Sequence, residues 1–274
     1  MLWQRVLTAL VLIPLVVAGI LYLDTPTLAL VLGSMVLVGA YEMARLAQLR
    51  GVAPQLAFVI AVAVLLWLAY RFVTPSLVIA SQWVMALWWM LMTAALVTRR
   101  RELLKVEAMR PTILLLGGLV LVTAWVAITR LHGGGTHGPA LLLFLFVLIW
   151  VADTGAYFSG RAFGRRKLSP FVSPGKTWAG VAGAIVGGLL SGLFLSASGL
   201  AGELPMLPWV MLCVLVVAVS IGGDLWESRL KREAGVKDSG QLLPGHGGML
   251  DRIDSLLAAA PVFALGANLL GAAA

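Results

Sequence analysis

Acidic side chains gather in one segment near the C-terminal end of the chain. Of the 12 Asp and Glu residues in the sequence, half lie between positions 223 and 254: Asp224, Glu227, Glu233, Asp238, Asp251 and Asp254. The same segment carries several basic residues, Arg229, Lys231, Arg232, Lys237 and Arg252. Carboxylates suit Mg²⁺, and Lys and Arg side chains suit phosphate oxygens. This mixture is typical of a metal-assisted phosphate site, although an ordinary linker beside a membrane could also carry capping acids and basic residues.

The spacing of these residues favours the metal site. One set falls at i, i+3, i+4 and i+7, which is one face of a helix: Asp224, Glu227, Ser228 and Lys231. Asp251 and Asp254, at i and i+3, share a face at the start of the next apolar run. Charges this close to hydrocarbon are costly unless they are paired or hold a cation. If the helix before Asp224 continues past it, two helix ends should bring their carboxylates together on Mg²⁺.

The segment between these two helix ends is rich in glycine: Gly235, Gly240, Gly245, Gly247 and Gly248, with Pro244. Glycines let the backbone approach a ligand closely and turn N–H groups toward anions. His246 lies within this run and is open to two interpretations. It could act as a general acid or base, or it could bind phosphate or brace the loop, because nucleotidyl transfer depends mainly on positioning and electrostatics.

A second stretch could also meet phosphate. Asp153 ends a predicted span, where an ionisable residue is a candidate for function or the partner of a nearby arginine. Further on comes Ser173-Pro-Gly-Lys-Thr-Trp178, in which Lys176 and Thr177 could contact phosphate. The string Gly-Lys-Thr is not expected to be a P-loop, because the first glycine of that motif would fall at Pro170 and no strand is expected before it.

These residues are set in a chain that is too apolar for a soluble protein. Of its 274 residues, 61% are hydrophobic and 12% are charged, and the mean hydropathy is +0.99. Soluble domains average about 45–50% apolar and about 25% charged residues. We expect an all-α, polytopic membrane protein with about nine transmembrane helices. The predicted ranges are 6–23, 27–46, 55–73, 76–98, 112–130, 140–159, 178–198, 207–224 and 255–273.

The basic residues predict the orientation of these spans. With the N-terminus in the cytoplasm, all but two of the 20 Lys and Arg residues fall in cytoplasmic segments, the exceptions being Arg71 and Arg130. This asymmetry predicts an odd number of spans, with the N-terminus cytoplasmic and the C-terminus outside. It also explains the net charge of +8 without a nucleic-acid partner. We expect a multi-pass protein of a bacterial cytoplasmic membrane whose active site faces the cytoplasm.

Three other features are expected to be structural. The single cysteine, Cys213, excludes an internal disulfide and should be a buried apolar side chain. His132 and His137 lie in a glycine-rich stretch and should belong to a solvated turn rather than a metal site. Gly183 and Gly187 permit close helix packing, which we expect within the chain, while self-association into a homodimer stays open.

The longest motif resembles the signature of the phosphatidate cytidylyltransferases, or CDP-diglyceride synthases. It runs Ser228-x-Leu-Lys-Arg-x4-Lys237-Asp238-x-Gly-x2-Leu-Pro-Gly-His246-Gly-Gly-Met-x-Asp251-Arg252-Ile-Asp254. Three shorter elements are also similar to family features: Asp153-x-Gly-Ala-Tyr, Ser-Pro-x-Lys-Thr-Trp and Gly-Asp-Leu-x-Glu-Ser. The motif resemblance covers roughly 150–254, and the N-terminal half resembles the family only in hydropathy.

The resemblance implies a reaction and its cofactors. Members of that family transfer the cytidylyl group of CTP to phosphatidic acid in the lipid bilayer, which gives CDP-diacylglycerol and pyrophosphate. The resemblance implies Mg²⁺ at Asp224 and Asp251, with K⁺ as a second cation. Three further aspartates, Asp153, Asp238 and Asp254, are expected to orient metal-bound water or basic side chains.

The resemblance also implies roles for individual side chains. A catalytic group should stabilise charge on the transferring and leaving oxygens: Lys231, Arg232, Lys237, His246 and Arg252. Substrate binding is expected from Lys176, Thr177, Ser228, Gly247 and Gly248. On this prediction residues 1–110 are N-terminal transmembrane helices, and 111–274 form a C-terminal transmembrane catalytic domain with cytoplasmic active-site loops at 153–178 and 223–254.

Other classes of membrane protein fit parts of the pattern. A transporter or channel would carry polar residues on broken helices near the midplane, whereas here the ionisable residues lie near one surface. A CTP-dependent lipid kinase would transfer the γ-phosphate and release CDP, and only the signature separates it from a cytidylyltransferase. A scaffold protein would leave the clustered carboxylates unexplained.

Overall fold

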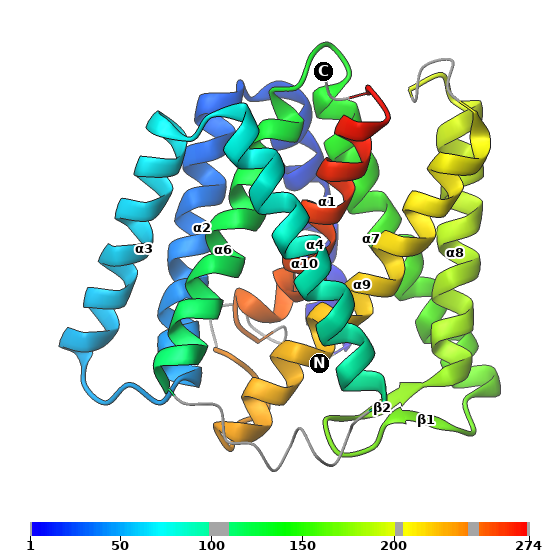
Figure 1. Cartoon of the computed structure of the whole chain (residues 1–274). Coiled ribbons are helices and arrows are strands. Elements are labelled where there is room, and N and C mark those ends of the chain that lie inside the picture. The colour runs from blue at the N-terminus through cyan, green and yellow to red at the C-terminus, as the bar shows by residue number, and fades with distance from the viewer. Residues whose placement is uncertain (1, 99–109, 201–204, 241–246, 273–274) are drawn as a thin grey trace.

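The computed structural model describes residues 2–98, 110–200, 205–240 and 247–272, with side chains from residue 10 onward. Within these ranges the chain forms nine α-helices and one β-hairpin (Figure 1). The helices are α1 (Leu2–Tyr22), α2 (Thr25–Leu46), α3 (Val52–Phe72), α4 (Pro75–Thr98), α6 (Arg110–His132), α7 (Gly138–Phe163), α8 (Trp178–Ala197), α9 (Met206–Glu233) and α10 (Leu250–Leu269). The hairpin consists of β1 (Lys167–Ser169) and β2 (Ser173–Thr177).

The helix content confirms a polytopic, all-α membrane protein, to which the hairpin is a small addition. In the described part of the chain, seven helices are long and apolar enough to cross a membrane: α2, α3, α4, α6, α7, α8 and α9. In α1 the side chains are described from Leu10 onward, and the stretch Leu10–Tyr22 is apolar. α10 carries Asp251, Arg252 and Asp254 in its first turns. Each of the nine predicted ranges therefore matches a helix, and seven of these helices are long and apolar enough to cross a membrane.

Near the candidate site residues, three helices extend beyond their predicted ranges. α9 continues to Glu233 instead of ending at 224, and α10 begins at Leu250 instead of at 255. α7 runs to Phe163, so Asp153 lies inside the helix and not at its end. The apolar runs end earlier than the helices do, because Glu, Lys and Arg are themselves good helix formers.

α7, α8 and α9 form one closely packed group because glycines lie at their contacts. A Cβ atom added at Gly155 of α7 would lie 2.6 Å from the carbonyl oxygen of Gly183 in α8. At Gly187 it would lie 3.2 Å from Cγ1 of Val151, again in α7. The expectation that Gly183 and Gly187 serve packing within the chain is confirmed.

A short β-hairpin connects α7 to α8. Its strands pair antiparallel, with Lys167 opposite Thr177 and Ser169 opposite Ser173. The prediction that no strand precedes the Gly-Lys-Thr string is wrong, because β1 precedes it and β2 contains it. The string still does not form a P-loop, since it lies within a strand rather than in a loop between strand and helix.

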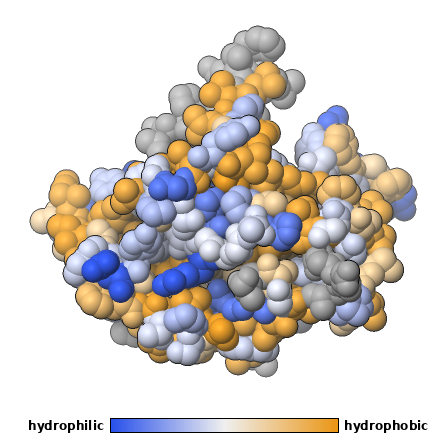
Figure 2. Space-filling view, turned by 90° about the horizontal axis from the view of Figure 1, so that it is seen from above, coloured by the Kyte–Doolittle hydropathy of each residue, from blue (hydrophilic) through white to orange (hydrophobic). Residues whose placement is uncertain are grey.

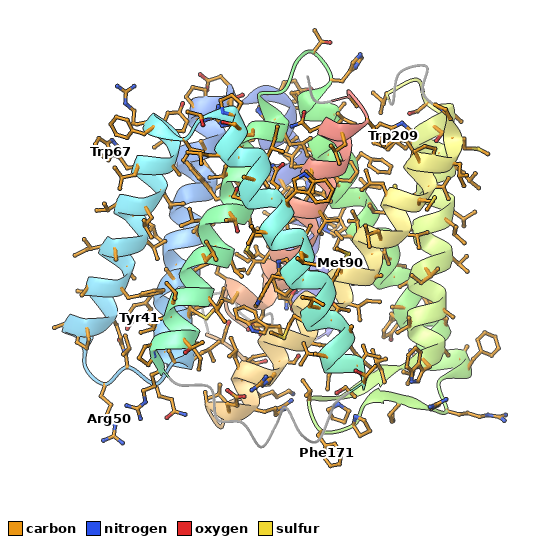
Figure 3. All side chains as sticks on the ribbon, in the orientation of Figure 1. Tyr41, Arg50, Trp67, Met90, Phe171 and Trp209 are labelled. Carbon is orange, nitrogen blue, oxygen red and sulfur yellow. The ribbon has the colours of Figure 1, made fainter. Side chains whose placement is uncertain are left out.

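Apolar side chains cover the flanks of the bundle, and polar residues gather at its ends. α3 exposes large apolar side chains such as Leu65 and Trp67, as a lipid-facing helix does. Figure 2 looks onto one end, where hydrophilic residues gather and hydrophobic residues show at the rim. Arg50 and Phe171 lie at the opposite end from Trp209 (Figure 3). α10 runs through the middle of the bundle and buries side chains such as Phe263 (Figure 1).

The expectation of a solvated turn is wrong for His132, which is buried. Its Nδ1 lies 2.9 Å from Thr25 Oγ1, and its Nε2 lies 2.9 Å from the carbonyl oxygen of Ile20. His132 thereby ties the end of α6 to the turn between α1 and α2. His137 is exposed, and Cys213 is buried as expected.

Candidate active site

The acidic face of α9 forms as its spacing predicts. The Ser228 hydroxyl donates to Asp224 Oδ1 at 3.1 Å, and Lys231 Nζ lies 2.7 Å from Glu227 Oε2. Both contacts join residues one helical turn apart, where side chains on one face meet. Glu227 is buried, and within the described ranges its second oxygen, Oε1, has no hydrogen-bond partner. This face therefore carries both a closed ion pair and an oxygen available to a further ligand.

Asp251 of α10 meets the same face of α9. Its Oδ1 lies 2.5 Å from Lys231 Nζ, so one ammonium group bridges acids on two helices. Its Oδ2 accepts from the backbone N–H of Ser239 at 2.9 Å, the Ser239 hydroxyl at 3.0 Å and the N–H of Gly248 at 2.8 Å. Gly247 has a φ of +80°, a left-handed conformation that favours glycine. The chain on both sides of residues 241–246 therefore turns its N–H groups onto one carboxylate.

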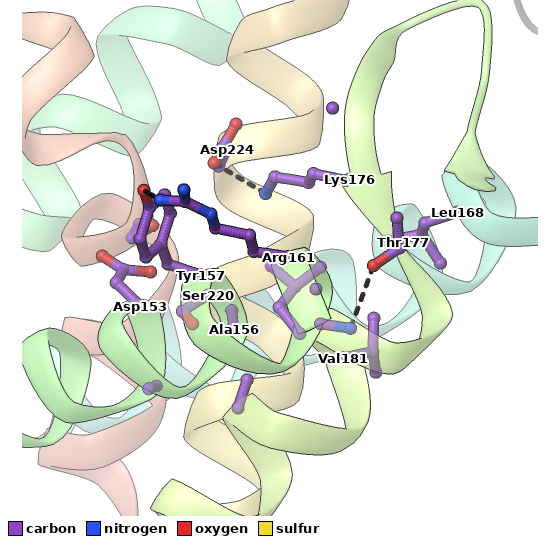
Figure 4. Close-up of a pocket in the computed structure, with 17 residues that line it drawn as sticks. Asp153, Ala156, Tyr157, Arg161, Leu168, Lys176, Thr177, Val181, Ser220 and Asp224 are labelled. Atoms are coloured by element: carbon purple, nitrogen blue, oxygen red, sulfur yellow. Dashed lines mark hydrogen bonds and ion pairs between the residues drawn. The ribbon is translucent and has the colours of Figure 1, made fainter. Parts of the chain in front are cut away.

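Asp224 faces a cavity of about 480 Å³ between α7, β2, α8 and α9 (Figure 4). Lys176 Nζ, from β2, lies 2.6 Å from Asp224 Oδ2. On the α7 side of the cavity, Arg161 Nη1 donates to the Tyr157 hydroxyl at 3.0 Å. The apolar part of the wall includes Ala156, Val181 and Ala184. The cavity thus combines charged groups with an apolar surface.

Two aspartates without an assigned role lie within electrostatic reach of Asp224. Asp153 lines the cavity, where the charges of Lys176, Asp224 and Arg252 act on it. The charges of Asp224 and Lys176 also act on Asp254. Arg252 is exposed, and its positive charge acts on Asp153, which lines the cavity. The negative charge near Asp224 therefore includes an aspartate on α7 and one on α10.

Three further predicted residues are exposed: Arg232, Lys237 and Asp238. Arg232 donates through Nε to the carbonyl oxygen of Val172 at 3.3 Å, and through Nη1 to that of Val236 at 3.4 Å. Lys237 and Asp238 are exposed on the segment that follows α9. Arg232 therefore links α9 to the hairpin, while Lys237 and Asp238 face the surroundings.

Two predicted substrate contacts already have partners. The Thr177 hydroxyl accepts from the N–H of Gly180 at 3.1 Å and caps α8. The N–H of Gly248 is bound to Asp251. The predicted role of His246 falls outside the described residues.

The carboxylates fit Mg²⁺ as an oxygen-donor set. In proteins this ion is usually held by one or two carboxylates, with water and substrate phosphates as its other ligands. Among the residues that the structure describes, no three His, Cys, Asp or Glu side chains form a ready-made metal cluster. Asp224 and Asp251 each already contact a lysine ammonium group, at 2.6 and 2.5 Å. This set suits a cation that brings water and substrate oxygens with it.

Sequence reasoning missed four polar residues of this region: Glu42, Ser239, Tyr157 and Arg161. Glu42 lies in α2 and contacts the start of α10. A lone acid inside the predicted span 27–46 is itself a signal, because ionisable residues in spans are rare and commonly functional. Tyr157 and Arg161 follow Asp153 at i+4 and i+8, on one face of α7. Ser239 carried no such signal.

Comparisons with known proteins extend over almost the whole chain. The model of the cytidylyltransferase family matches residues 3–270. A phosphatidate cytidylyltransferase of Pseudomonas aeruginosa is 43% identical over 264 residues, which cover 96% of each chain. One of Haemophilus influenzae is 41% identical over 284 residues, with 96% of this chain and 97% of the relative covered. One of Brucella suis is 45% identical over 144 residues, 51% of each chain. The similarity therefore includes the N-terminal helices as well as the acidic segment.

Proposed function

This chain belongs to the cytidylyltransferase family and makes CDP-diacylglycerol from CTP and phosphatidate, and on that premise we propose that Asp224 and Asp251 hold Mg²⁺ during the reaction. Enzymes of this family use a divalent cation. The observation that carries the proposal is the meeting of Glu227 of α9 and Asp251 of α10 at the Lys231 ammonium group, on the helix face that also carries Asp224. Mg²⁺, when bound, neutralises charge on the triphosphate and on the pyrophosphate that leaves.

In the proposed mechanism the phosphate of phosphatidate attacks the α-phosphorus of CTP in line, and pyrophosphate leaves. No covalent enzyme intermediate is needed. Four basic side chains stabilise charge on the transferring and leaving oxygens: Lys231, Arg232, Lys237 and Arg252. Ser228 steadies Asp224 through its hydrogen bond of 3.1 Å. Lys176 gives up its contact with Asp224 and binds a phosphate of CTP.

The remaining predicted residues have supporting roles in this proposal. Asp153 and Asp254, which lie within electrostatic reach of Asp224, orient water and basic side chains. Asp238 has the same predicted role from its exposed position. Thr177, His246, Gly247 and Gly248 stay predicted contacts of the substrate phosphates, and K⁺ stays a predicted second cation.

We propose that Tyr157 and Arg161 bind the phosphate group of the lipid substrate. Lys176 and Lys231 are each paired with a carboxylate, whereas Arg161 contacts the neutral hydroxyl of Tyr157. Its guanidinium charge is therefore available to an anion, and its planar fork suits phosphate. The apolar wall of the same cavity suits the glycerol and acyl part of a lipid.

The orientation in the membrane is part of the proposal. The end of the bundle that holds Arg50 and the hairpin faces the cytoplasm of a bacterial cell, where CTP is found (Figure 3). The N-terminus is then cytoplasmic and the C-terminus outside. The division at residue 110 into N-terminal helices and a catalytic domain stays a prediction, as does a homodimer.

The test uses purified protein in detergent with CTP, Mg²⁺ and phosphatidate, and chromatography identifies the nucleotide product. We expect pyrophosphate and CDP-diacylglycerol, and a loss of rate on the order of 10³-fold in Asp251→Asn, which corresponds to several kcal/mol of charge stabilisation. Asp224→Asn should show a similar loss. An Asp251→Asn enzyme with unchanged rate and unchanged Mg²⁺ requirement would remove Asp251 from the metal site.

A further inference from the structure

Glu42 is a buried acid that the proposed mechanism does not use. It lies in α2, and only 4% of its surface is exposed. Its Oε1 accepts from the N–H of Met249 at 2.9 Å, and its Oε2 accepts from the N–H of Leu250 at 2.8 Å. Ser239 Oγ also lies 2.8 Å from Oε2, so its single proton is shared between Glu42 and Asp251. An acid inside a membrane-spanning helix is costly, so this full set of partners indicates a specific role.

The contacts of Glu42 with the N–H groups of Met249 and Leu250 complete the hydrogen bonding at the start of α10. A helix leaves its first N–H groups without partners inside the helix, and a nearby side chain normally accepts from them. Met249, at the cap position of α10, makes no such side-chain contact. Glu42, which lies 207 positions earlier in the chain, accepts from the N–H of Met249 in its place. Glu42 of α2 therefore holds the start of α10 in place.

The same carboxylate is connected to Asp251 through one side chain. Ser239 Oγ lies 2.8 Å from Glu42 Oε2 and 3.0 Å from Asp251 Oδ2. Asp251 is the second residue of α10, the helix whose start Glu42 holds. Glu42 thus acts on Asp251 along two routes, the helix backbone and the Ser239 hydroxyl.

The glycines around Glu42 leave room for this arrangement. A Cβ atom added at Gly248 would collide with both oxygens of Glu42 and with Ser239 Oγ. One added at Gly240 would collide with Glu42 Oε1. The backbone on both sides of residues 241–246 therefore packs directly on this one carboxylate.

We propose that Glu42 is a positioning residue for Asp251, which it holds in place through the start of α10 and through Ser239. The inference rests on the proposed role of Asp251 as a Mg²⁺ ligand. It explains why an N-terminal helix carries a buried acid at the catalytic segment. It assigns to Glu42 no contact with substrate and no proton transfer.

The test is Glu42→Gln in the full-length protein, which keeps the size of the side chain but removes its charge and one acceptor oxygen. We expect kcat to fall about 10- to 100-fold, the usual loss when a residue that supports a metal ligand is changed. The Mg²⁺ concentration for half-maximal rate should rise, while the KM for CTP changes little. In metal-free protein, hydrogen exchange at the N–H groups of Met249 and Leu250 should be faster by about tenfold or more.

A double-mutant comparison tests the connection through Ser239. Ser239→Ala should lower kcat alone, but should add little to Glu42→Gln, because the two side chains act in one chain of contacts. Glu233→Gln is the matched control, since Glu233 is a helical acid paired with Arg229 at 2.6 Å. It should leave kcat, the Mg²⁺ dependence and the exchange of Met249 and Leu250 unchanged.

Glu42→Gln with faster exchange but unchanged kcat and Mg²⁺ dependence would make Glu42 a structural cap only and would overturn the proposal. Independent, multiplying effects of Glu42→Gln and Ser239→Ala would overturn the connection to Asp251. If Glu42→Gln does not fold, Ser239→Ala is read by the same kcat and Mg²⁺ criteria. A failure of the proposed metal site gives another result. Asp251→Asn would then keep the Mg²⁺ requirement of the unchanged enzyme, with either Glu or Gln at position 42.

Discussion

The two aspartates assigned to the metal are held in opposite ways. Asp224 lines an open cavity, and it contacts Lys176 from a hairpin strand and Ser228 from its own helix. Asp251 is almost enclosed, with a side chain 8% exposed. Its two oxygens receive Lys231, two backbone N–H groups and a hydroxyl. One carboxylate is therefore held by contacts that can exchange, and the other by contacts that are built into the fold.

This difference teaches how one site can be both preorganised and open to a large substrate. Backbone N–H groups and a buried lysine keep Asp251 in one orientation before any ligand arrives. At Asp224, the Lys176 ammonium can leave the carboxylate for a phosphate at modest cost, because the pair is partly solvated. We infer that Asp251, at the start of α10, keeps one orientation throughout the reaction. Asp224 and Lys176, at the cavity, change partners when substrate binds.

The largest expected difference is between the two lysines. Lys231→Met should lower the free energy of unfolding by about 3–5 kcal/mol, because it leaves two buried carboxylates without their shared cation. Lys176→Met should cost about 1 kcal/mol or less, since the side chains of Lys176 and Asp224 are 25% and 32% exposed. Thermal unfolding of substrate-free protein in detergent measures both values.

A double variant tests whether unpaired buried carboxylates cause the loss of stability in Lys231→Met. Asp251→Asn combined with Lys231→Met should recover part of the lost stability, because one of the unpaired charges is then absent. Equal losses for Lys231→Met and Lys176→Met would mean that the two sides do not differ in rigidity.

A smaller difference is expected between two glycines. Gly248→Ala places a Cβ atom against Glu42 and Ser239, so we expect about 1–3 kcal/mol of destabilisation and a lower kcat. Gly175, in β2, has no other atom within 4 Å of an added Cβ, so Gly175→Ala should change stability by about 0.5 kcal/mol or less. Unfolding midpoints and steady-state rates compare the pair. Tolerance of Gly248→Ala would show that the enclosed side can relax.

The smallest effect is expected on the cavity side. Arg161→Lys keeps the charge but loses the planar fork and the hydrogen bond to Tyr157, so the KM for phosphatidate should rise roughly tenfold. The KM for CTP should stay within about twofold, because Arg161 is assigned to the lipid phosphate alone. Arg165→Lys, an exposed arginine that does not line the cavity, is the control. A rise in the KM for CTP instead would assign Arg161 to the nucleotide.

The helices and the acidic face could be predicted because their signals are local. Apolar runs located each helix in the described part of the chain, and the spacing of four residues predicted their common face on α9: Asp224, Glu227, Ser228 and Lys231. The contact of Asp251 with that face followed from its place at the start of the next run.

Contacts between distant segments could not be predicted in the same way. Nothing in the periodicity of α2 specifies that Glu42 meets Met249, 207 positions away. His132 was misplaced for the same reason, since its partners Thr25 and Ile20 lie more than 100 positions earlier. The hairpin was missed because a three-residue strand such as β1 is too short to show alternation.

The buried carboxylate of α2 also has a consequence for biogenesis. α2 is synthesised and inserted long before α10, so for most of that time Glu42 lies in the membrane without Ser239, Met249 and Leu250. The partners of Glu42 are complete only when α10 has joined the bundle, so the burial of Glu42 and the placement of Asp251 are completed together. We infer that Asp251 reaches its place only once α10 has packed against α2 and α9.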